Sequence, residues 1–96
     1  MLRIEIIGDA TLEEEVRKGL GRIRKGLGHS SIYPVSGQGV KGGRFGTNVW
    51  PEENTLFLMY LPEEDLEKVQ LLISTIRSQY PHNGLAAFVL PGAQEI

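Results

Sequence analysis

The chain has 96 residues, of which 41% are hydrophobic and 23% charged, with a formal net charge of -2 and no cysteine. This composition is typical of one small folded domain, residues 1–96, and excludes an intrinsically disordered chain, a disulfide scaffold and thiol chemistry. The charge gives no reason to expect a nucleic-acid partner. Charges interrupt residues 1–7, where a signal peptide or a spanning helix needs an apolar run, so we expect a cytoplasmic protein that is not membrane-embedded.

The first predicted elements are a strand and a helix. Side chains of residues 2–7 alternate between two sides, which predicts a strand that ends at Gly8 and Asp9. A helix should begin at Thr11, whose hydroxyl can cap the first turn while Glu14 completes a capping box. Gly19 falls beside the apolar stripe of this helix, where a missing side chain would allow a close approach of helix to sheet. That stripe is Leu12, Val16, Leu20, Ile23 and Leu27.

A second strand and a long glycine-rich segment follow. Residues 30–35 predict a strand at a sheet edge, because Pro34 cannot donate to a ladder. Residues 37–51 have neither a helical nor a strand period, and they contain five glycines, the cations Lys41 and Arg44, and the only tryptophan. Structureless loops of this length are uncommon in compact domains unless they bind something or are disordered. The composition therefore fits an anion-binding or partner-binding loop, and a mobile surface loop has the same chemistry.

The second half of the chain predicts a strand, a helix and a last strand. Residues 55–61 are apolar on both sides, which is typical of a strand buried on both faces. A helix opens at Pro62, and residues 81–84 form the turn that leads to a last strand at residues 85–90. The apolar stripe of this helix is Leu66, Val69, Leu72, Ile73, Ile76 and Tyr80.

The order βαββαβ favours an α+β fold of ferredoxin-like type, a four-stranded antiparallel sheet with two helices on one face. Strands one and three should be central, and strands two and four should be edges. Two helices cover only one face of the sheet, yet strand three is apolar on both. The uncovered face must therefore meet another subunit, since soluble monomers rarely expose large apolar patches.

Side chains with catalytic or metal-binding chemistry are sparse. The only histidines are His29 and His82, one in each of two turn regions, where a solvent-facing role is the commoner one. We therefore expect no metal site. The acidic groups at residues 13–15 and 63–65 both occupy the first turn of a predicted helix, where the helix dipole explains them. We expect no enzyme activity, because no nucleophile has an identifiable activating base.

Three motifs together resemble those of PII-like signalling proteins, and the resemblance covers nearly the whole chain. They are Gly37-Gln38-Gly39, Gly46-Thr47-Asn48-Val49-Trp50-Pro51 and Ala87-Phe88-Val89-Leu90-Pro91. The match is closest to a short branch with a Gly-Thr-His-Val-Trp-Pro-like motif. The resemblance implies a ferredoxin-like homotrimer whose sheets face the three-fold axis, adenine nucleotides or related effectors bound in clefts between subunits, and a loop after strand two that docks on a transporter or an enzyme.

The chain also departs from nitrogen-regulatory PII proteins. Its loop after strand two is shorter and has no modifiable tyrosine, and no lysine lies near Gly84, where those proteins place a phosphate-contacting base. Asn48 stands where the short branch usually has histidine.

The residues and the resemblance together give a set of candidate site residues. Trp50 and Pro51 are expected to anchor the loop or contact a partner. The ligand-binding candidates are Gly37, Gln38, Gly39, Lys41, Arg44 and Gly84.

Three functional classes stay open. The first is a trimeric sensor of a small anionic effector, such as an adenine nucleotide. The second is an interaction subunit that binds no ligand and docks through its loop. The third is a small acylphosphate or phosphate-ester hydrolase, because residues 38–40 with Arg44 are similar to the phosphate loop of acylphosphatases. That loop, however, joins the first strand to the first helix.

Overall fold

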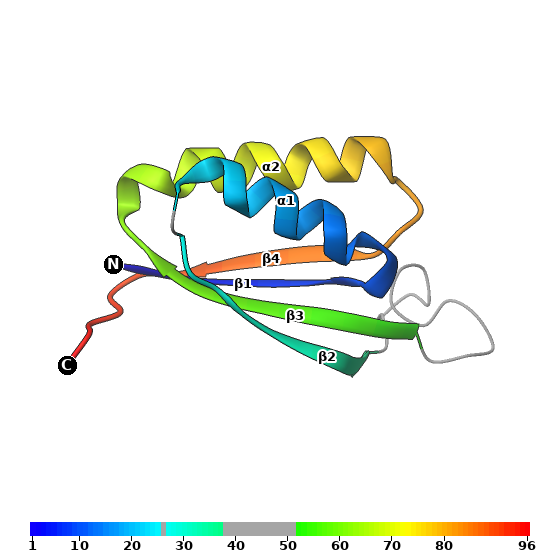
Figure 1. Cartoon of the computed structure of the whole chain (residues 1–96), viewed down its shortest axis with the longest axis horizontal. Helices are drawn as coiled ribbons and strands as arrows, with labels where there is room; N and C mark the ends of the chain where they lie inside the picture. Colours follow the sequence, from blue (N-terminus) through cyan, green and yellow to red (C-terminus); the bar gives the residue numbers. More distant parts are fainter. Residues whose placement is uncertain (26, 38–51) are drawn as a thin grey trace.

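The computed structural model describes residues 1–25, 27–37 and 52–96. Its elements follow one another in the predicted βαββαβ order, with a short 3₁₀ turn before each helix (Figure 1). They are β1 (Leu2–Asp9), η1 (Ala10–Leu12), α1 (Glu13–Ile23), β2 (Ser30–Gly37), β3 (Glu52–Leu61), η2 (Glu63–Asp65), α2 (Leu66–Gln79) and β4 (Leu85–Leu90).

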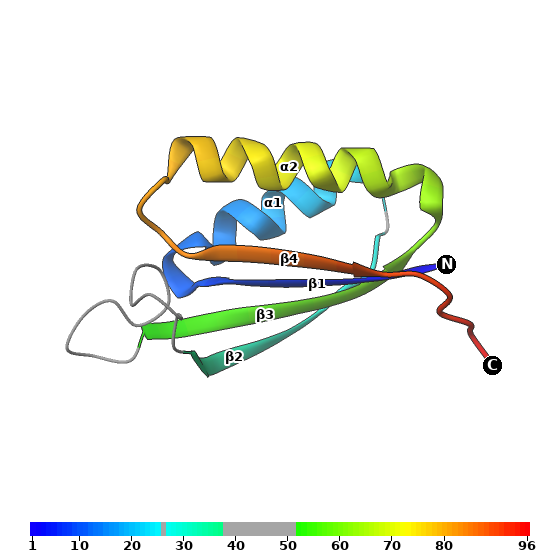
Figure 2. The same ribbon diagram turned by 180° about the vertical axis from the view of Figure 1, so that it is seen from behind.

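The four strands form one antiparallel sheet in the order β2-β3-β1-β4. Both helices pack on the same face, as the two opposite views show (Figures 1 and 2). The predicted ferredoxin-like fold is therefore confirmed, with β1 and β3 central and β2 and β4 at the edges. The register of β2 against β3 shifts between Ile32 and Val35, around the cis peptide bond that precedes Pro34.

The core lies between the helices and the sheet. Alternate residues of β1 point toward the helices and are buried, as its polar and apolar alternation predicts. His29 is half-buried with its ring 5.6 Å from that of Phe57, so the expectation of a solvent-facing histidine is wrong at this position. The remaining core is contributed by Leu2, Ile4, Ile6, Leu12, Val16, Leu20, Met59, Leu61, Val69, Ile73, Ile76 and Leu85.

The start of the first helix differs from the sequence prediction. Asp9, not Thr11, is the capping residue, because its Oδ1 accepts hydrogen bonds from the amide and the hydroxyl of Thr11 at 3.0 Å each. β1 also continues through Asp9, whose amide donates to the carbonyl of Gly84 at 2.9 Å. The long-range bond to Gly84 thus extends the strand beyond its predicted end.

The end of the first helix also lies earlier than predicted. α1 stops at Ile23, because Arg24 adopts an extended backbone conformation with φ of -153° and ψ of 128°. Leu27, expected on the helical stripe, packs against the core from the connection that follows α1.

Gly19 permits a close approach of α1 to α2, whereas the sequence predicts an approach of α1 to the sheet. A Cβ atom at Gly19 would lie 2.2 Å from Cδ1 and 2.8 Å from Cδ2 of Leu72. The side chain of Leu72 therefore occupies the space that any larger residue at position 19 would need.

The acidic residues before α2 have a role that the helix dipole alone did not predict. Asp65 is only 2% exposed, and its Oδ2 accepts a hydrogen bond of 2.8 Å from Nε of Arg24. This ion pair joins the end of α1 to the start of α2. The pair with Arg24 holds the pKa of Asp65 below its ordinary value, chiefly through the hydrogen bond.

Candidate functional site

One end of the sheet gathers the segments that the sequence predicts to be functional. β1 ends there at Asp9, β2 ends at Gly37, β3 begins at Glu52 and β4 begins at Leu85. The 3₁₀ turn before α1 and the turn that follows α2 lie at this same end (Figures 1 and 2). We call it the loop end.

A polar network holds the turn before β4 against the start of α1. Nδ2 of Asn83 donates to Oγ1 of Thr11 at 3.0 Å and to Oδ2 of Asp9 at 3.4 Å. The amide of Asn83 donates to the carbonyl of Tyr80 at 3.2 Å, which closes the turn. Gly84 is buried behind this network. The turn is therefore tied both to β1 and to the cap of α1, which gives it a fixed position at the loop end.

Glu13 forms a second polar cluster near the loop end. Its Oε1 accepts a hydrogen bond of 2.9 Å from Oγ1 of Thr55, and its Oε2 accepts one of 2.6 Å from Nη2 of Arg17. Arg17 also contacts Glu14. The hydrogen bonds from Arg17 and Thr55, in that order, hold the pKa of Glu13 below its ordinary value. This carboxylate is therefore charged and paired at neutral pH, which suits a structural role and does not suit proton transfer.

Side chains at the end of the β2–β3 ribbon pair with each other. The hydroxyl of Tyr33 donates to Oε1 of Glu53 at 2.9 Å, and this bond raises the pKa of Tyr33 above its ordinary value. Nδ2 of Asn54 donates to the carbonyl of Val35 at 3.3 Å. These two contacts join the strands on both sides of the long connection between β2 and β3.

The two candidate site residues that the structure describes lie on opposite edges of the sheet. Gly37 ends β2 and Gly84 directly precedes β4, and both belong to the loop end. Neighbouring strands are about 4.8 Å apart, so three strand steps separate the two edges by roughly 14 Å. One chain therefore does not bring Gly37 and Gly84 together. The other candidates lie outside the described residues: Gln38, Gly39, Lys41, Arg44, Trp50 and Pro51.

The face of the sheet that the helices leave uncovered, here called the open face, is largely apolar. Tyr60 is 50% exposed and Phe88 is 56% exposed on this face, and Leu58 lies beside them opposite Glu5. The residues of β3 that alternate with them face the helices and are buried. The prediction that this strand is apolar on both faces is confirmed. Ile32 and Leu90 complete the exposed part of the open face.

A charged pair lies in the middle of the open face. Nε of Arg3 is 3.0 Å from Oε2 of Glu5, and Nη1 of Arg3 donates to the hydroxyl of Tyr60 at 3.3 Å. The charges on this face therefore satisfy each other. The sequence analysis placed Arg3 and Glu5 on the strand but missed their pairing.

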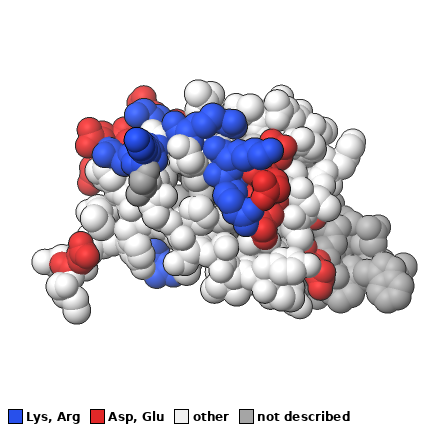
Figure 3. All heavy atoms as spheres, viewed as in Figure 1, with Lys and Arg blue, Asp and Glu red and all other residues white. Residues whose placement is uncertain are grey.

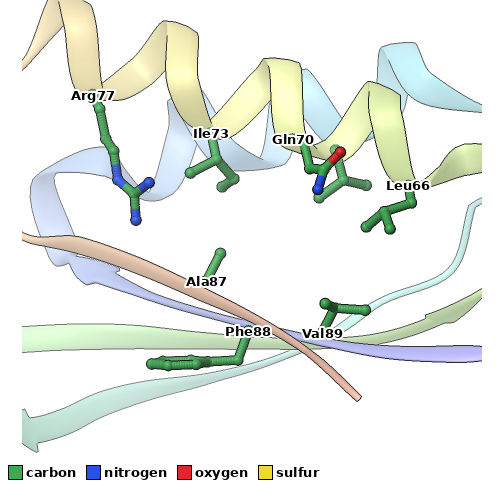
Figure 4. Close-up of a pocket in the computed structure, with 8 residues that line it drawn as sticks. Leu66, Gln70, Ile73, Arg77, Ala87, Phe88 and Val89 are labelled. Atoms are coloured by element: carbon green, nitrogen blue, oxygen red, sulfur yellow. The ribbon is translucent and has the colours of Figure 1, made fainter. Parts of the chain in front are cut away.

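A groove of about 210 Å³ lies between α2 and the edge strand β4 (Figure 4). Leu66 and Ile73 point into it from the helix, while Ala87 and Val89 point toward them from the strand (Figure 4). Phe88 lies on the other side of β4 (Figure 4).

Arg77 closes one end of this groove. Its guanidinium donates to the carbonyl of Leu85 from Nε at 3.3 Å and from Nη2 at 3.2 Å. Sequence reasoning did not find the groove, although the small and uncharged side chains at residues 85–90 could have signalled it.

The described residues offer neither a metal cluster nor a helical membrane span. Within residues 1–25, 27–37 and 52–96, no group of three or more His, Asp or Glu side chains could hold a metal ion. Neither helix in the described part of the chain combines the length and the apolar character that a membrane span requires.

No protein-family model and no curated protein matches the sequence. Solved structures do match. CPII from Thiomonas intermedia K12, bound to ADP and bicarbonate, has a TM-score of 0.67 at 20% identity, over 93% of this chain and 82% of CPII. A protein from Thermus thermophilus that has been described as PII-like signalling has a TM-score of 0.62 at 24% identity, over 93% of this chain and 83% of its own. The chain has the fold of PII-like proteins.

The predicted resemblance to PII-like proteins is thus confirmed at the level of the fold. A de novo designed protein, Foldit4, also matches, with a TM-score of 0.63 at 9% identity over 96% of this chain and 98% of its own. This architecture can therefore exist without a natural function, and function has to be argued from particular residues.

Proposed function

We propose that the chain is a PII-like regulatory protein of the cytoplasm that forms a homotrimer and binds a small anionic effector between its subunits. The observation that carries the proposal is the position of Gly37 and Gly84 at one end of the sheet but on opposite edges. A small ligand that contacts both glycines needs the β2 edge of one copy beside the β4 edge of another.

A three-fold arrangement supplies this contact. When three sheets surround an axis parallel to their strands, each β2 edge lies beside the β4 edge of the next copy, and equivalent ends lie at the same height. If the open faces point toward the axis, Phe88, Tyr60 and their apolar neighbours are covered as well. The uncharged strand β4 supports the same assembly, since edge strands in soluble proteins are usually protected by charged residues or by another chain.

The chemistry of the loop supports an anionic effector. Lys41 and Arg44 can supply positive charge, and the amides of Gly37, Gln38 and Gly39 can supply neutral donors. Related folds give the first candidate, because CPII structures hold ADP, AMP and bicarbonate. An adenine nucleotide is therefore the effector to test first. In this proposal the loop changes shape with the effector and docks on a partner protein, such as a transporter or an enzyme.

Light scattering and a thermal-shift screen test the proposal. We expect a trimer at micromolar protomer concentration and a higher unfolding temperature with ADP, AMP or a cyclic nucleotide, alone and with bicarbonate. A ligand at 100 times its dissociation constant adds roughly 2.7 kcal/mol to the free energy of unfolding. A stable monomer would contradict the assembly.

The screen also separates the three functional classes. A trimer that responds to none of these ligands would favour an interaction subunit that binds no ligand. Turnover of acetyl phosphate would identify a hydrolase.

A further inference from the structure

The outer side of the two helices carries a second groove, here called the helical groove. It has a volume of about 310 Å³ and lies between α1 and α2, away from the sheet. Leu71 stands at its rim with 67% of its surface exposed, the highest exposure of any large apolar residue inside a described helix or strand. The residues that line it are Arg22, Ile23, Lys68, Leu71, Leu72 and Thr75.

The charges around the helical groove are positive. Arg22 and Lys68 line it from opposite helices, and no acidic residue lines it. Lys18 and Lys25 lie four residues before and three residues after Arg22, which places them on the same side of α1 or of its extension. Lysine and arginine side chains gather over this helical layer (Figure 3).

These cations have little internal compensation. Among the described residues Arg22, Lys18 and Lys25 form no ion pair, and Nζ of Lys68 is 3.9 Å from Oδ1 of Asp65, at the limit of such a contact.

The walls of the helical groove are fixed in place. The contact of Gly19 with Leu72 brings α1 and α2 close together at the floor of the groove. At one end, the 2.8 Å hydrogen bond between Arg24 and Asp65 joins the two helices. The groove therefore exists before anything binds, which lowers the entropic cost of docking.

We propose that the helical groove is a docking site for an acidic amphipathic helix of a partner protein. Leu71 and Leu72 would contact the apolar stripe of that helix, while Arg22 and the lysines would pair with its flanking carboxylates. A third helix can pack along the groove between two others, which is a common mode of peptide recognition. A membrane is the weaker candidate, because a membrane-binding face presents several exposed apolar side chains and this one presents Leu71.

This site is separate from the effector site of the proposed function. It lies on the face of the molecule opposite to the open face, so it stays accessible when three copies assemble through their sheets (Figure 1). It also uses no residue of the loop between β2 and β3. The partner could therefore remain attached to the helices while the loop responds to an effector.

A pair of designed peptides tests the docking site. The first peptide is an amphipathic helix with a leucine stripe flanked by glutamates, and the second has the same stripe flanked by lysines. We expect the glutamate peptide to bind the full-length protein, with amide NMR shifts concentrated at Arg22, Lys68, Leu71 and Thr75. Leu71→Ala should weaken this binding about 3- to 10-fold. The double variant Arg22→Glu/Lys68→Glu should weaken it at least 10-fold and bind the lysine peptide more tightly than the wild type does.

Controls separate docking from general effects. Gln94→Glu and Arg22→Gln change the net charge equally, but residue 94 lies in the exposed C-terminal tail, so only Arg22→Gln should weaken binding. Light scattering must show the same oligomer for all variants. The proposal is overturned if the glutamate peptide causes no shifts at 1 mM, if shifts map elsewhere, or if the double variant fails to exchange its preference. Binding of phosphatidylserine vesicles in place of the peptide would identify a membrane surface and overturn it equally.

Discussion

Two glycines in the first helix should respond in opposite ways to alanine. Gly21 is exposed, and a Cβ atom there would meet no other atom within 4 Å. Gly21→Ala should therefore raise the free energy of unfolding by about 0.5–1 kcal/mol, the difference in helix propensity between the two residues. At Gly19 the same gain competes with a collision, because the new methyl group would lie 2.2, 2.8 and 3.0 Å from three atoms of Leu72.

The collision should outweigh the propensity at Gly19. Overpacking of this kind costs about 1–3 kcal/mol, so Gly19→Ala should lower the free energy of unfolding by up to about 2 kcal/mol. Leu72 is half-buried and can turn toward solvent, which keeps the cost below that of a collision with the backbone. The turned side chain would also change the floor of the helical groove.

Urea unfolding followed by circular dichroism measures both effects, at one fixed protomer concentration because assembly contributes to stability. A double-mutant cycle with Leu72→Ala supplies the decisive comparison. In that background Gly19→Ala should become stabilising and match Gly21→Ala. If Gly19→Ala and Gly21→Ala have equal effects in the wild type, the inferred contact of Gly19 with Leu72 is not what limits position 19.

Three further predictions concern assembly, pH and the effector. Phe88→Glu on the open face should dissociate the trimer in light scattering, whereas Leu71→Glu on the helical layer should leave it intact; equal behaviour would contradict the assigned interface. Arg24 keeps the pKa of Asp65 below its ordinary value of 3.8, so their pair stabilises the fold above about pH 4 and this stabilisation is lost as the pH falls through the lowered pKa. Asp65→Asn should thus lower the thermal midpoint at neutral pH, by a difference that shrinks in strong acid; a constant difference would argue against the ion pair. Arg44→Ala should weaken ADP binding about 10- to 150-fold in calorimetry without dissociating the trimer, and an unchanged affinity would remove Arg44 from the effector site.

Local patterns were sufficient to predict most of the fold. The last strand was predicted at residues 85–90 and begins and ends there, because the glycine before it and the proline after it are strong local signals. The end of β1 was missed because it depends on a hydrogen bond from Asp9 to Gly84, which is far away in the sequence. The role of Asp65 was missed for the same reason, since its partner Arg24 lies 41 residues away.

The candidate site was predictable only in part. Glycines and their flanking strands were enough to propose Gly37 and Gly84 as site residues. Their positions on opposite edges follow from the strand order, which composition and spacing do not contain. The pairing of Arg3 with Glu5 across one strand position, and the cations that collect between the two helices, likewise needed the packed chain.

The bond from Arg77 to the carbonyl of Leu85 limits how another strand can align with β4. The hydrogen bond from Asp9 to Gly84 shows that Leu85 directs its own main-chain groups away from β1, and by alternation Ala87 and Val89 do the same. Because a guanidinium already occupies the Leu85 carbonyl, an incoming strand finds complete donor and acceptor pairs only at Ala87 and Val89. Arg77 thereby acts as a stop that selects one alignment, and sliding by one residue would turn the side chains of the added strand to the wrong face.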